Sequence, residues 1–205
     1  MTDLARMAAT QSVAPARSKG ALTKAMIVDQ ALKIASRQGL EGLTVGHLAE
    51  ALAMSKSGVF AHFGSREELQ LAVVREYYDR FEAAVFQPAL QEPKGLARLQ
   101  KMINLWMQTS IQELSAGCIF ISGAVEFDDR PGPVRDELVR SVQIWRAALK
   151  RAIEQAIEVG DLKKDCAPEA MLFQIYSTCR ACTTTRAFYK FLKALISQRN
   201  RSNRP

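Results

Sequence analysis

Apolar residues recur three and four positions apart along most of the chain, which is the spacing of one face of an α-helix. Seven prolines and several turn residues divide this pattern into segments. The segments predict helices over residues 22–38, 44–52, 55–63, 65–86, 95–114, 117–127, 133–159 and 168–198, the last one broken near 183–185. Since no segment alternates apolar and polar residues as a strand does, the predicted fold class is all-α.

Residues at the ends of the first segments are typical helix caps. Gly39 follows the first segment as a stop signal, and Thr44 precedes the second as an N-cap. Ser65 and Glu68 form a capping box, the strongest start signal in the chain. Residues 1–21 have little periodicity before Leu22, and we expect a disordered N-terminal arm there.

Residues 22–66 have the pattern of a helix-turn-helix, with a supporting helix before two short helices and a tight turn between them. Small Ala49 and Ala53 allow the two short helices to approach closely. In the second helix, Val59 and Phe63 are expected to face the core. Its opposite face carries short or basic side chains that suit the major groove of DNA. These are Lys56, Ser57, Gly58 and Ala61.

Residues 24–70 resemble the N-terminal DNA-binding domain of the TetR (tetracycline-repressor-like) family. The matching stretch is ALKIASRQGLEGLTVGHLAEALAMSKSGVFAHFGSREEL, and its most telling positions are Thr44, His62-Phe63 and Ser65-Arg66-Glu67. Two positions depart from the family pattern. Ala53 stands where the family commonly has a turn glycine, and Phe60 stands where it commonly has a phosphate-contacting tyrosine.

The resemblance implies three regions: an arm over 1–21, a helix-turn-helix DNA-binding domain over 22–66, and an effector-binding and dimerisation domain over 67–205. It implies that Thr44 and Arg66, each at a helix N-terminus, contact phosphates. His62 is expected near the DNA backbone, with a structural role between helices as its alternative. The residues expected to contact DNA are Thr44, Ser55, Lys56, Ser57, Gly58, Phe60, Ala61, His62 and Arg66.

The charge distribution agrees with a DNA-binding end. Residues 1–66 carry eight Lys/Arg against four Asp/Glu, whereas residues 67–179 carry thirteen against seventeen. Residues 180–205 carry seven basic side chains and no acid. A basic head on an acidic body suggests that one end faces a polyanion. The basic tail has a second interpretation, a solvated helix end.

Composition and motifs exclude several other classes. The longest apolar stretch, from Cys118 to Val125, is far shorter than the about 20 residues needed to cross a bilayer. Asp3 and Arg6 interrupt any secretory h-region, so we expect a cytoplasmic protein with reduced thiols and no membrane contact.

No catalytic constellation stands out. The two histidines, His47 and His62, both lie in the helix-turn-helix, and there is no phosphate-binding glycine loop. We therefore expect no enzyme activity, no cofactor and no metal site, and an all-α enzyme is the weakest alternative. Cys179 and Cys182 have a redox-like spacing, but their apolar helical surroundings favour a packing role.

Bulky apolar side chains in the second half predict a pocket for an effector. We expect a mainly hydrophobic, neutral or weakly polar molecule, bound between segments 65–86 and 95–114 and the helix from Pro133. The same side chains would also suit an ordinary core. The residues expected to bind the effector are Tyr78, Phe81, Met102, Trp106, Met107, Phe120 and Tyr176. A thiol-sensing regulator is the alternative, with Cys118, Cys166, Cys179 and Cys182 as its candidates.

Taken together, these features predict a ligand-responsive DNA-binding transcriptional regulator, a repressor released from a palindromic operator by a small effector. One recognition helix covers too few base pairs for specificity, so a homodimer on double-stranded DNA is expected. Segments 133–159 and 168–198 are expected to form the two-fold interface. Residues expected to pack in this region are Trp145, Leu149, Met171 and Ile175.

Overall fold

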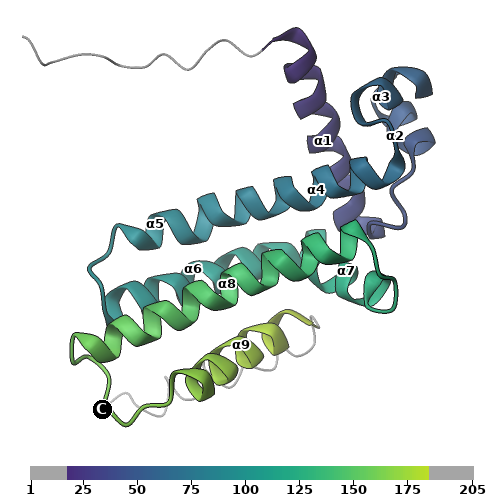
Figure 1. The fold of residues 1–205 in the computed structure, drawn as a ribbon. Coiled ribbons are helices and arrows are strands. Elements are labelled where there is room, and N and C mark those ends of the chain that lie inside the picture. Colours follow the sequence, from purple (N-terminus) through teal and green to yellow (C-terminus); the bar gives the residue numbers. More distant parts are fainter. Residues whose placement is uncertain (1–17, 185–205) are drawn as a thin grey trace, which may run out of the picture.

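The computed structural model describes residues 18–184, and every regular element in this part of the chain is a helix (Figure 1). The elements are α1 (Lys19–Gln38), α2 (Val45–Ala51), α3 (Lys56–Phe63), α4 (Arg66–Phe81), the π-helix η1 (Glu82–Phe86), α5 (Gln87–Leu90), α6 (Leu96–Ala116), α7 (Ile119–Phe127), α8 (Pro133–Glu158) and α9 (Pro168–Thr184). The predicted fold class is confirmed. The distal part of the last predicted helix and most of the basic tail lie outside the described residues.

The predicted caps are present in the structure. The side chains of Thr44 and Ser65 accept hydrogen bonds from backbone N–H groups three residues further on, and Ser55 does the same at the start of α3. The predicted start of the first helix is wrong by three residues. Ser18 accepts a hydrogen bond from the N–H of Ala21 at 3.2 Å, so α1 begins at Lys19 and the last residues assigned to the disordered arm are helical.

The turn between α2 and α3 has the strain expected from its sequence. Ala53 has a φ of 52° and is the non-glycine residue with positive φ in the described part of the chain. A left-handed conformation costs a residue with a Cβ about 1–2 kcal/mol. The alanine in place of the family's glycine is therefore tolerated, at a cost to stability.

The long helix that starts at Arg66 continues past its predicted end at Phe86. Its π-helical turn, η1, closes where the N–H of Gln87 donates to the carbonyl of Glu82, five residues earlier. Pro88 follows at once in α5, and because proline has no N–H the rod forgoes one backbone hydrogen bond just after the π-turn. Helices α4, η1 and α5 thus form one nearly continuous rod along the body (Figure 1).

Helices α1, α2 and α3 form a head at one end of the rod, and α6, α8 and α9 form the body beside it (Figure 1). Helix α8 contacts α4, α6, α7 and α9, so it is the central helix of the body. The short helix α7 lies where head and body meet.

Buried apolar side chains form two clusters. The cluster that we call the head core contains side chains of α1, α2, α3, the loop before α2 and α4 as far as Tyr77, and also Ile119 and Phe127 of α7 and Leu138 of α8. The cluster that we call the body core contains side chains of α4, η1, α5, α6, α8 and α9, among them Trp106 and Trp145. The head core therefore does not stop at residue 66, because α7 and α8 contribute to it.

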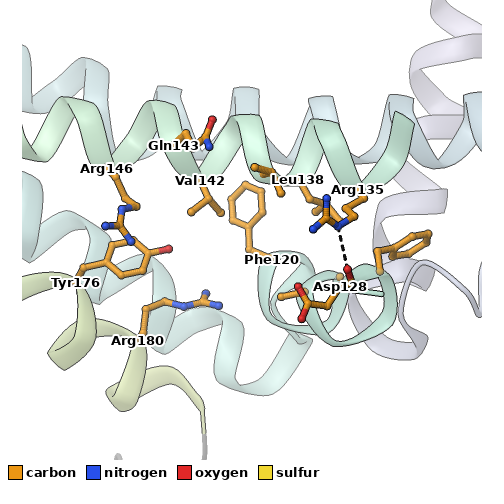
Figure 2. A pocket seen from close by; sticks show the side chains of 13 residues that line it. Phe120, Asp128, Arg135, Leu138, Val142, Gln143, Arg146, Tyr176 and Arg180 are labelled. Atoms are coloured by element: carbon orange, nitrogen blue, oxygen red, sulfur yellow. Dashed lines mark hydrogen bonds between the residues drawn. The ribbon is translucent and has the colours of Figure 1, made fainter. Parts of the chain in front are cut away.

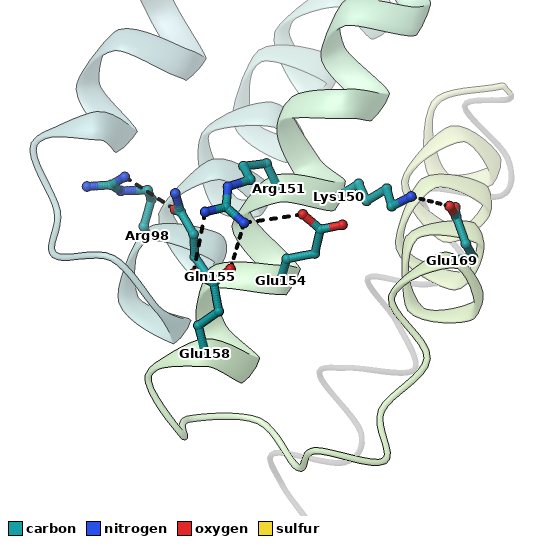
Figure 3. A network of polar contacts seen from close by, with 7 residues as sticks. All are labelled: Arg98, Lys150, Arg151, Glu154, Gln155, Glu158 and Glu169. Atoms are coloured by element: carbon teal, nitrogen blue, oxygen red, sulfur yellow. Dashed lines mark hydrogen bonds and ion pairs between the residues drawn. The ribbon is translucent and has the colours of Figure 1, made fainter.

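A surface network braces the end of the body away from the head (Figure 3). Arg98 donates to the carbonyls of Leu90 and Glu92 and reaches Oε1 of Gln155 at 3.4 Å. Lys150 pairs with Glu169 and so ties α8 to α9. Because the side chains of Lys150 and Glu169 are 39% and 70% exposed, their ion pair contributes at most about 1 kcal/mol.

Candidate functional site

Helix α3 presents a polar face to solvent and an apolar face to the head core. Val59 and Phe63 are 1% and 9% exposed, whereas Lys56, Ser57 and Ala61 are exposed. This confirms the predicted orientation of the helix. Phe60 also lies on the outer side, 44% exposed. An exposed apolar ring on this helix is available for contact with sugar or thymine methyl groups.

Ser55 orders the N-terminal end of α3. Its Oγ accepts from the N–H of Gly58 at 3.0 Å and lies 3.1 Å from Oγ of Ser57. A Cβ at Gly58 would lie 3.1 Å from Oγ of Ser55, tighter than ordinary contact. Lys56 is therefore surrounded by small residues in the first turn of α3.

Arg66 binds the head itself in this structure. Its Nε donates to the carbonyl of Leu43 at 3.0 Å, a terminal nitrogen donates to the carbonyl of Glu41, and its guanidinium pairs with the Glu41 carboxylate at 3.7 Å. Arg66 thus fastens the loop before α2, a role that sequence reasoning missed. Its predicted contact with phosphate stays a prediction.

The other two candidates at the edge of the head also have partners. Thr44 accepts from the N–H of His47 at 3.2 Å as the N-cap of α2 and remains exposed. His62 is half-buried, with its ring centroid 6.5 Å from that of Phe63. Nζ of Lys24 lies 5.2 Å from the same Phe63 ring on another side. His62 therefore keeps both of its interpretations, DNA contact and local packing.

The loop over residues 39–43 is also held from the body. Gln70 of α4 donates to the carbonyl of Leu40 at 2.8 Å, and Glu126 of α7 accepts from the N–H of Glu41 at 2.9 Å. Arg130, just after α7, pairs with the Glu41 carboxylate at 3.2 Å. The loop that leads into α2 is therefore bound from both α4 and α7.

Two glycines make this close approach possible. At Gly39, with φ 79°, a Cβ would lie 1.7 Å from Oε1 of Glu126. At Gly117, with φ 95°, a Cβ would lie 1.6 Å from the carbonyl oxygen of Ser36 in α1. The carboxylate of Glu126 binds the head loop, and Glu126 lines neither of the two body cavities described below.

A cavity of about 570 Å³ lies between α7, α8 and α9, and we call it the outer chamber (Figure 2). The middle of the chamber is apolar, and the lining as a whole includes three arginines and one aspartate. Its lining residues are Phe120, Gly123, Ala124, Phe127, Asp128, Arg135, Leu138, Val139, Val142, Gln143, Arg146, Tyr176 and Arg180. A volume of this size suits a small-molecule ligand.

A much smaller cavity of about 30 Å³, the inner chamber, adjoins the outer one through shared wall residues. The shared residues are Phe120, Val142, Tyr176 and Arg180. In its wall the hydroxyl of Tyr77 hydrogen-bonds to Glu113 and lies 3.3 Å from Sγ of Cys118. The indole N–H of Trp145 is buried without a hydrogen-bond partner in the described part of the chain. The inner chamber thus combines aromatic rings with several polar groups.

Burial controls the protonation of the polar groups around the inner chamber. Burial raises the pKa of the Glu113 carboxyl above its usual value, although a hydrogen bond from Tyr77 opposes the rise. Burial also raises the pKa of the Cys118 thiol, and the nearby Glu113 carboxylate adds to the rise. A thiol with a raised pKa is a poor nucleophile at neutral pH, which weighs against Cys118 as a redox sensor.

The other cysteines give the thiol-sensing alternative little support. Cys179 is 4% exposed in the body core, in agreement with the packing role predicted for it. Cys166 is half-buried in the connection between α8 and α9. The side chain of Cys182 lies outside the described part of the structure.

The predicted effector residues divide between the cavities and the core. Phe120 and Tyr176 line both chambers, and Phe81 and Trp106 line the inner one. Tyr78 instead lines a separate groove between α4 and α8. The other two do not line these cavities: Met102 is 1% exposed in the body core, and Met107 packs against that core.

The outer chamber therefore lies nearer to α7 and α9 than the sequence had indicated. Sequence reasoning missed Arg135, Arg146 and Arg180 of its lining. The two arginines of α8 are 11 residues apart, which is three helical turns and places them on one face. That spacing is visible in the sequence, but it gains meaning only once α7 and α9 are placed against the same face.

Two features are absent from residues 18–184. No group of three or more His, Cys, Asp or Glu in this range is arranged to hold a metal ion. None of the helices in this range is long and apolar enough to cross a membrane.

Comparison with known proteins identifies the family. Residues 27–73 match the family described as bacterial regulatory proteins, tetR family, and residues 95–199 match the tetracyclin repressor-like C-terminal domain. The chain therefore belongs to the TetR family, and it is a DNA-binding transcriptional regulator, as its sequence predicted.

Individual proteins that are similar to this chain are also transcriptional regulators. The HTH-type transcriptional repressor DhaR of Mycobacterium sp. strain GP1 is 22% identical over 146 residues, which cover 71% of this chain and 72% of DhaR. A TetR transcriptional regulator from Chloroflexus aurantiacus has a TM-score of 0.73 at 21% identity, over 88% of this chain and 96% of that one. AibR, crystallised with isovaleryl coenzyme A and operator DNA, has a TM-score of 0.63 at 18% identity, over 78% and 85% of the two chains. These structures support the fold.

Proposed function

We propose that this regulator is a dimeric repressor, which binds a palindromic operator through two copies of α3 and leaves it when an effector occupies the outer chamber. The observation that carries the proposal is the double contact of α7. This helix lines the chamber with Gly123, Ala124 and Phe127 and holds the head loop through Glu126.

The DNA contacts belong to the exposed side of the head. Lys56, Ser57 and Gly58 at the start of α3 read base edges in the major groove, with Ser55, Phe60, Ala61 and His62 beside them. Thr44 and Arg66 flank this helix and contact phosphates. Arg66 serves both roles through different nitrogens, because its side chain remains 42% exposed while it fastens the head loop.

The dimer forms through the C-terminal helices. Ile144 of α8 is 39% exposed, and Phe173 of α9 is 67% exposed. Exposed apolar side chains of this size mark a surface for another protein, and a second copy of this chain is the partner that a palindrome requires. Trp145 and Leu149, expected from the sequence to pack in this region, are buried in the body core and serve the monomer.

Effector binding changes operator affinity by population shift. A molecule in the outer chamber favours the position of α7 that fits it best, and α7 carries the head loop with it. The change in DNA affinity equals the difference in effector affinity between the two head positions. The protein acts on chromosomal DNA in the cytoplasm, without a catalytic role of its own.

Selection of operators from random duplex DNA, followed by binding titrations, tests this function. We expect selected sites with two inverted half-sites and a complex of one dimer per site. Lys56→Ala should weaken binding to these sites, whereas Lys163→Ala, in the exposed connection between α8 and α9, should not. Sites without symmetry, or equal binding by both variants, would contradict the proposal.

A further inference from the structure

We propose that the outer chamber binds an organic anion with an apolar body, whose anionic group is held by Arg146 and Arg180. The inference rests on the proposed function, because it names the class of effector for the same chamber. It also replaces the neutral molecule that the sequence suggested, while it keeps the apolar body.

The charge of the lining favours an anion. Three guanidinium groups line the chamber against one carboxylate, that of Asp128. Among the described residues, no carboxylate lies within ion-pair distance of Arg135 or Arg146. Arginine recognises carboxylate and phosphate by parallel charge-assisted hydrogen bonds. The lining of the chamber therefore carries an excess of positive charge, which suits such a group.

The two ends of the chamber differ, and the difference places the anionic group. At one end Arg135 donates from Nε to the backbone carbonyl of Asp128 at 2.9 Å, and the carboxylate of the same Asp128 belongs to the lining. At the other end Arg146 of α8 faces Tyr176 and Arg180 of α9 (Figure 2). No carboxylate belongs to the outer chamber's lining at this second end; the nearby acid is Glu113, which lines the inner chamber together with Arg180.

Tyr176 holds the guanidinium of Arg146 in place at the second end of the chamber. The guanidinium of Arg146 lies 5.1 Å from the centroid of the Tyr176 ring, a cation–π contact that limits its motion. Figure 2 shows the Tyr176 hydroxyl and the Arg180 side chain extending toward Phe120. A carboxylate or phosphate between these groups would meet two cations from two different helices.

The middle of the chamber supplies the apolar contacts. Phe120 of α7 and Leu138 and Val142 of α8 lie between the two charged ends (Figure 2). Gly123 keeps α7 close to α8, because a Cβ there would lie 2.9 Å from a methyl group of Leu138. An anion bound at Arg146 and Arg180 would thus lay its apolar body along α7, the helix that contacts the head loop.

Two dyes with the same aromatic body test the proposal directly. The sulfonate 8-anilinonaphthalene-1-sulfonate carries an anionic group, and N-phenyl-1-naphthylamine has the same rings without it. Fluorescence titration of the full chain should show that the sulfonate binds at least about tenfold more tightly, the usual scale of a charge-assisted contact. Equal affinity for the two dyes would overturn the proposal.

Matched variants locate the anionic group. Arg146→Gln and Arg180→Gln should each weaken the sulfonate about tenfold and change the neutral dye less than about twofold. Arg135→Gln removes the same charge at the other end of the chamber, and Arg151→Gln removes it from the surface network of α8; both should have little effect. Equal losses in all four variants would overturn the assignment, since they would reflect net charge alone.

Competition separates the two sources of an anion. Octanoate displacing the sulfonate indicates a carboxylate, and displacement by octanoyl coenzyme A alone indicates a phosphate; either result supports the proposal. Displacement by methyl octanoate but by neither anion would overturn it. Operator binding is titrated separately without dye, so a failure of the anion preference is distinguished from a failure of the DNA-binding function.

Discussion

The head core and the body core are packed in different ways. The head core is built mainly from aliphatic side chains, and Ile27, Leu40, Leu43 and Leu48 in it are completely buried. In the body core, the Trp106 ring meets Trp145 edge-on at a centroid distance of 5.6 Å, and both rings line the inner chamber. The outer chamber lies where the two cores meet, lined by Phe127 and Leu138 of the head core and by Tyr176, which packs against the body core. The difference indicates a division of labour. A surface that must fit DNA rests on a closely packed core, while the region that must admit a ligand retains space.

The two cores are nevertheless mechanically joined. Helix α4 supplies Tyr77 to the head core and Phe81 to the body core, one turn apart. Helix α8 does the same with Leu138 and Trp145. A change of packing in one core is therefore transmitted along two rigid helices to the other.

The largest effect is expected at the junction of the two regions. Gly117→Ala would place a Cβ 1.6 Å from the backbone carbonyl of Ser36, which cannot move without displacing α1. We expect a loss of about 3–5 kcal/mol in the free energy of unfolding, measured by urea denaturation. Gly160→Ala is the control, because it has a similar φ of 88° but open space around it. The control should lose about 1–2 kcal/mol. Equal losses in the two variants would mean that α1 and Gly117 are not in close contact at the junction.

Trp106→Ala tests whether the body core can unfold independently of the head. Trp106 is 8% exposed, so its truncation should cost about 3–5 kcal/mol in stability, and Val125→Ala, at a side chain that is 82% exposed, should cost far less. Because the cores share α4 and α8, circular dichroism and operator binding should be lost in one thermal transition. Operator binding that survives a separate body transition would show instead that the head is autonomous and would favour a purely ligand-binding role for Trp106.

Lys56→Ala tests the head surface without touching either core. Lys56 is exposed, so thermal stability should stay within about 0.5 kcal/mol. Operator affinity should fall by about 1–3 kcal/mol if Lys56 contacts a base, with altered preference at that position. A uniform loss over all sequences, with the salt slope reduced by about one, would reassign Lys56 to a phosphate.

Glu126→Ala tests the connection between the regions. The variant loses the acceptor for the Glu41 N–H, a hydrogen bond to a charged group, and should lose about 1–2 kcal/mol in stability. Hydrogen exchange of the Glu41 amide should accelerate, and operator affinity should change although Glu126 lies on α7. Glu154→Ala, on the surface of α8, serves as the control. An unchanged Glu41 amide would show that α7 does not restrain the head loop.

The smallest effect concerns pH and the inner chamber. Burial raises the pKa of Glu113 in the folded protein, so its contribution to stability is greatest below the unfolded value and declines as pH rises toward the folded one. Glu113→Gln keeps an acceptor for the Tyr77 hydroxyl but carries no charge. At pH 7 it should be more stable than the parent by up to about 1 kcal/mol, and the gain should vanish near about pH 4. If the variant remained more stable than the parent at low pH, the gain would come from the packing of the glutamine side chain and not from the loss of a buried charge.

Much of the fold was accessible from the sequence because local signals were strong. The caps at Thr44, Ser55 and Ser65 and the apolar periodicity gave nearly every helix in the described range, and Ala53 marked the strained turn. The extension of the long helix to Leu90 was not predicted, since a π-turn leaves no clear sign in a single sequence.

The site was less accessible, because it depends on how distant helices meet. The outward face of α3 follows from its own periodicity, which explains why Val59 and Phe63 were assigned correctly. The role of Arg66 depends on carbonyls more than 20 residues away, and the charge of the chamber depends on α7, α8 and α9 converging. The effector residues were predicted from the bulk of apolar side chains alone. That criterion does not separate a core residue such as Met102 from a residue that lines a chamber, such as Phe120.

The π-turn over Glu82–Phe86 has a consequence for comparing this chain with its relatives. A turn closed by a bond over five residues holds one residue more than an α-helical turn, so it is equivalent to a single-residue insertion inside a helix. An alignment with a relative that lacks the turn needs a one-residue gap there. Without that gap, every position from Val85 to Leu90 would be equated with the wrong neighbour, and buried and exposed positions would be exchanged.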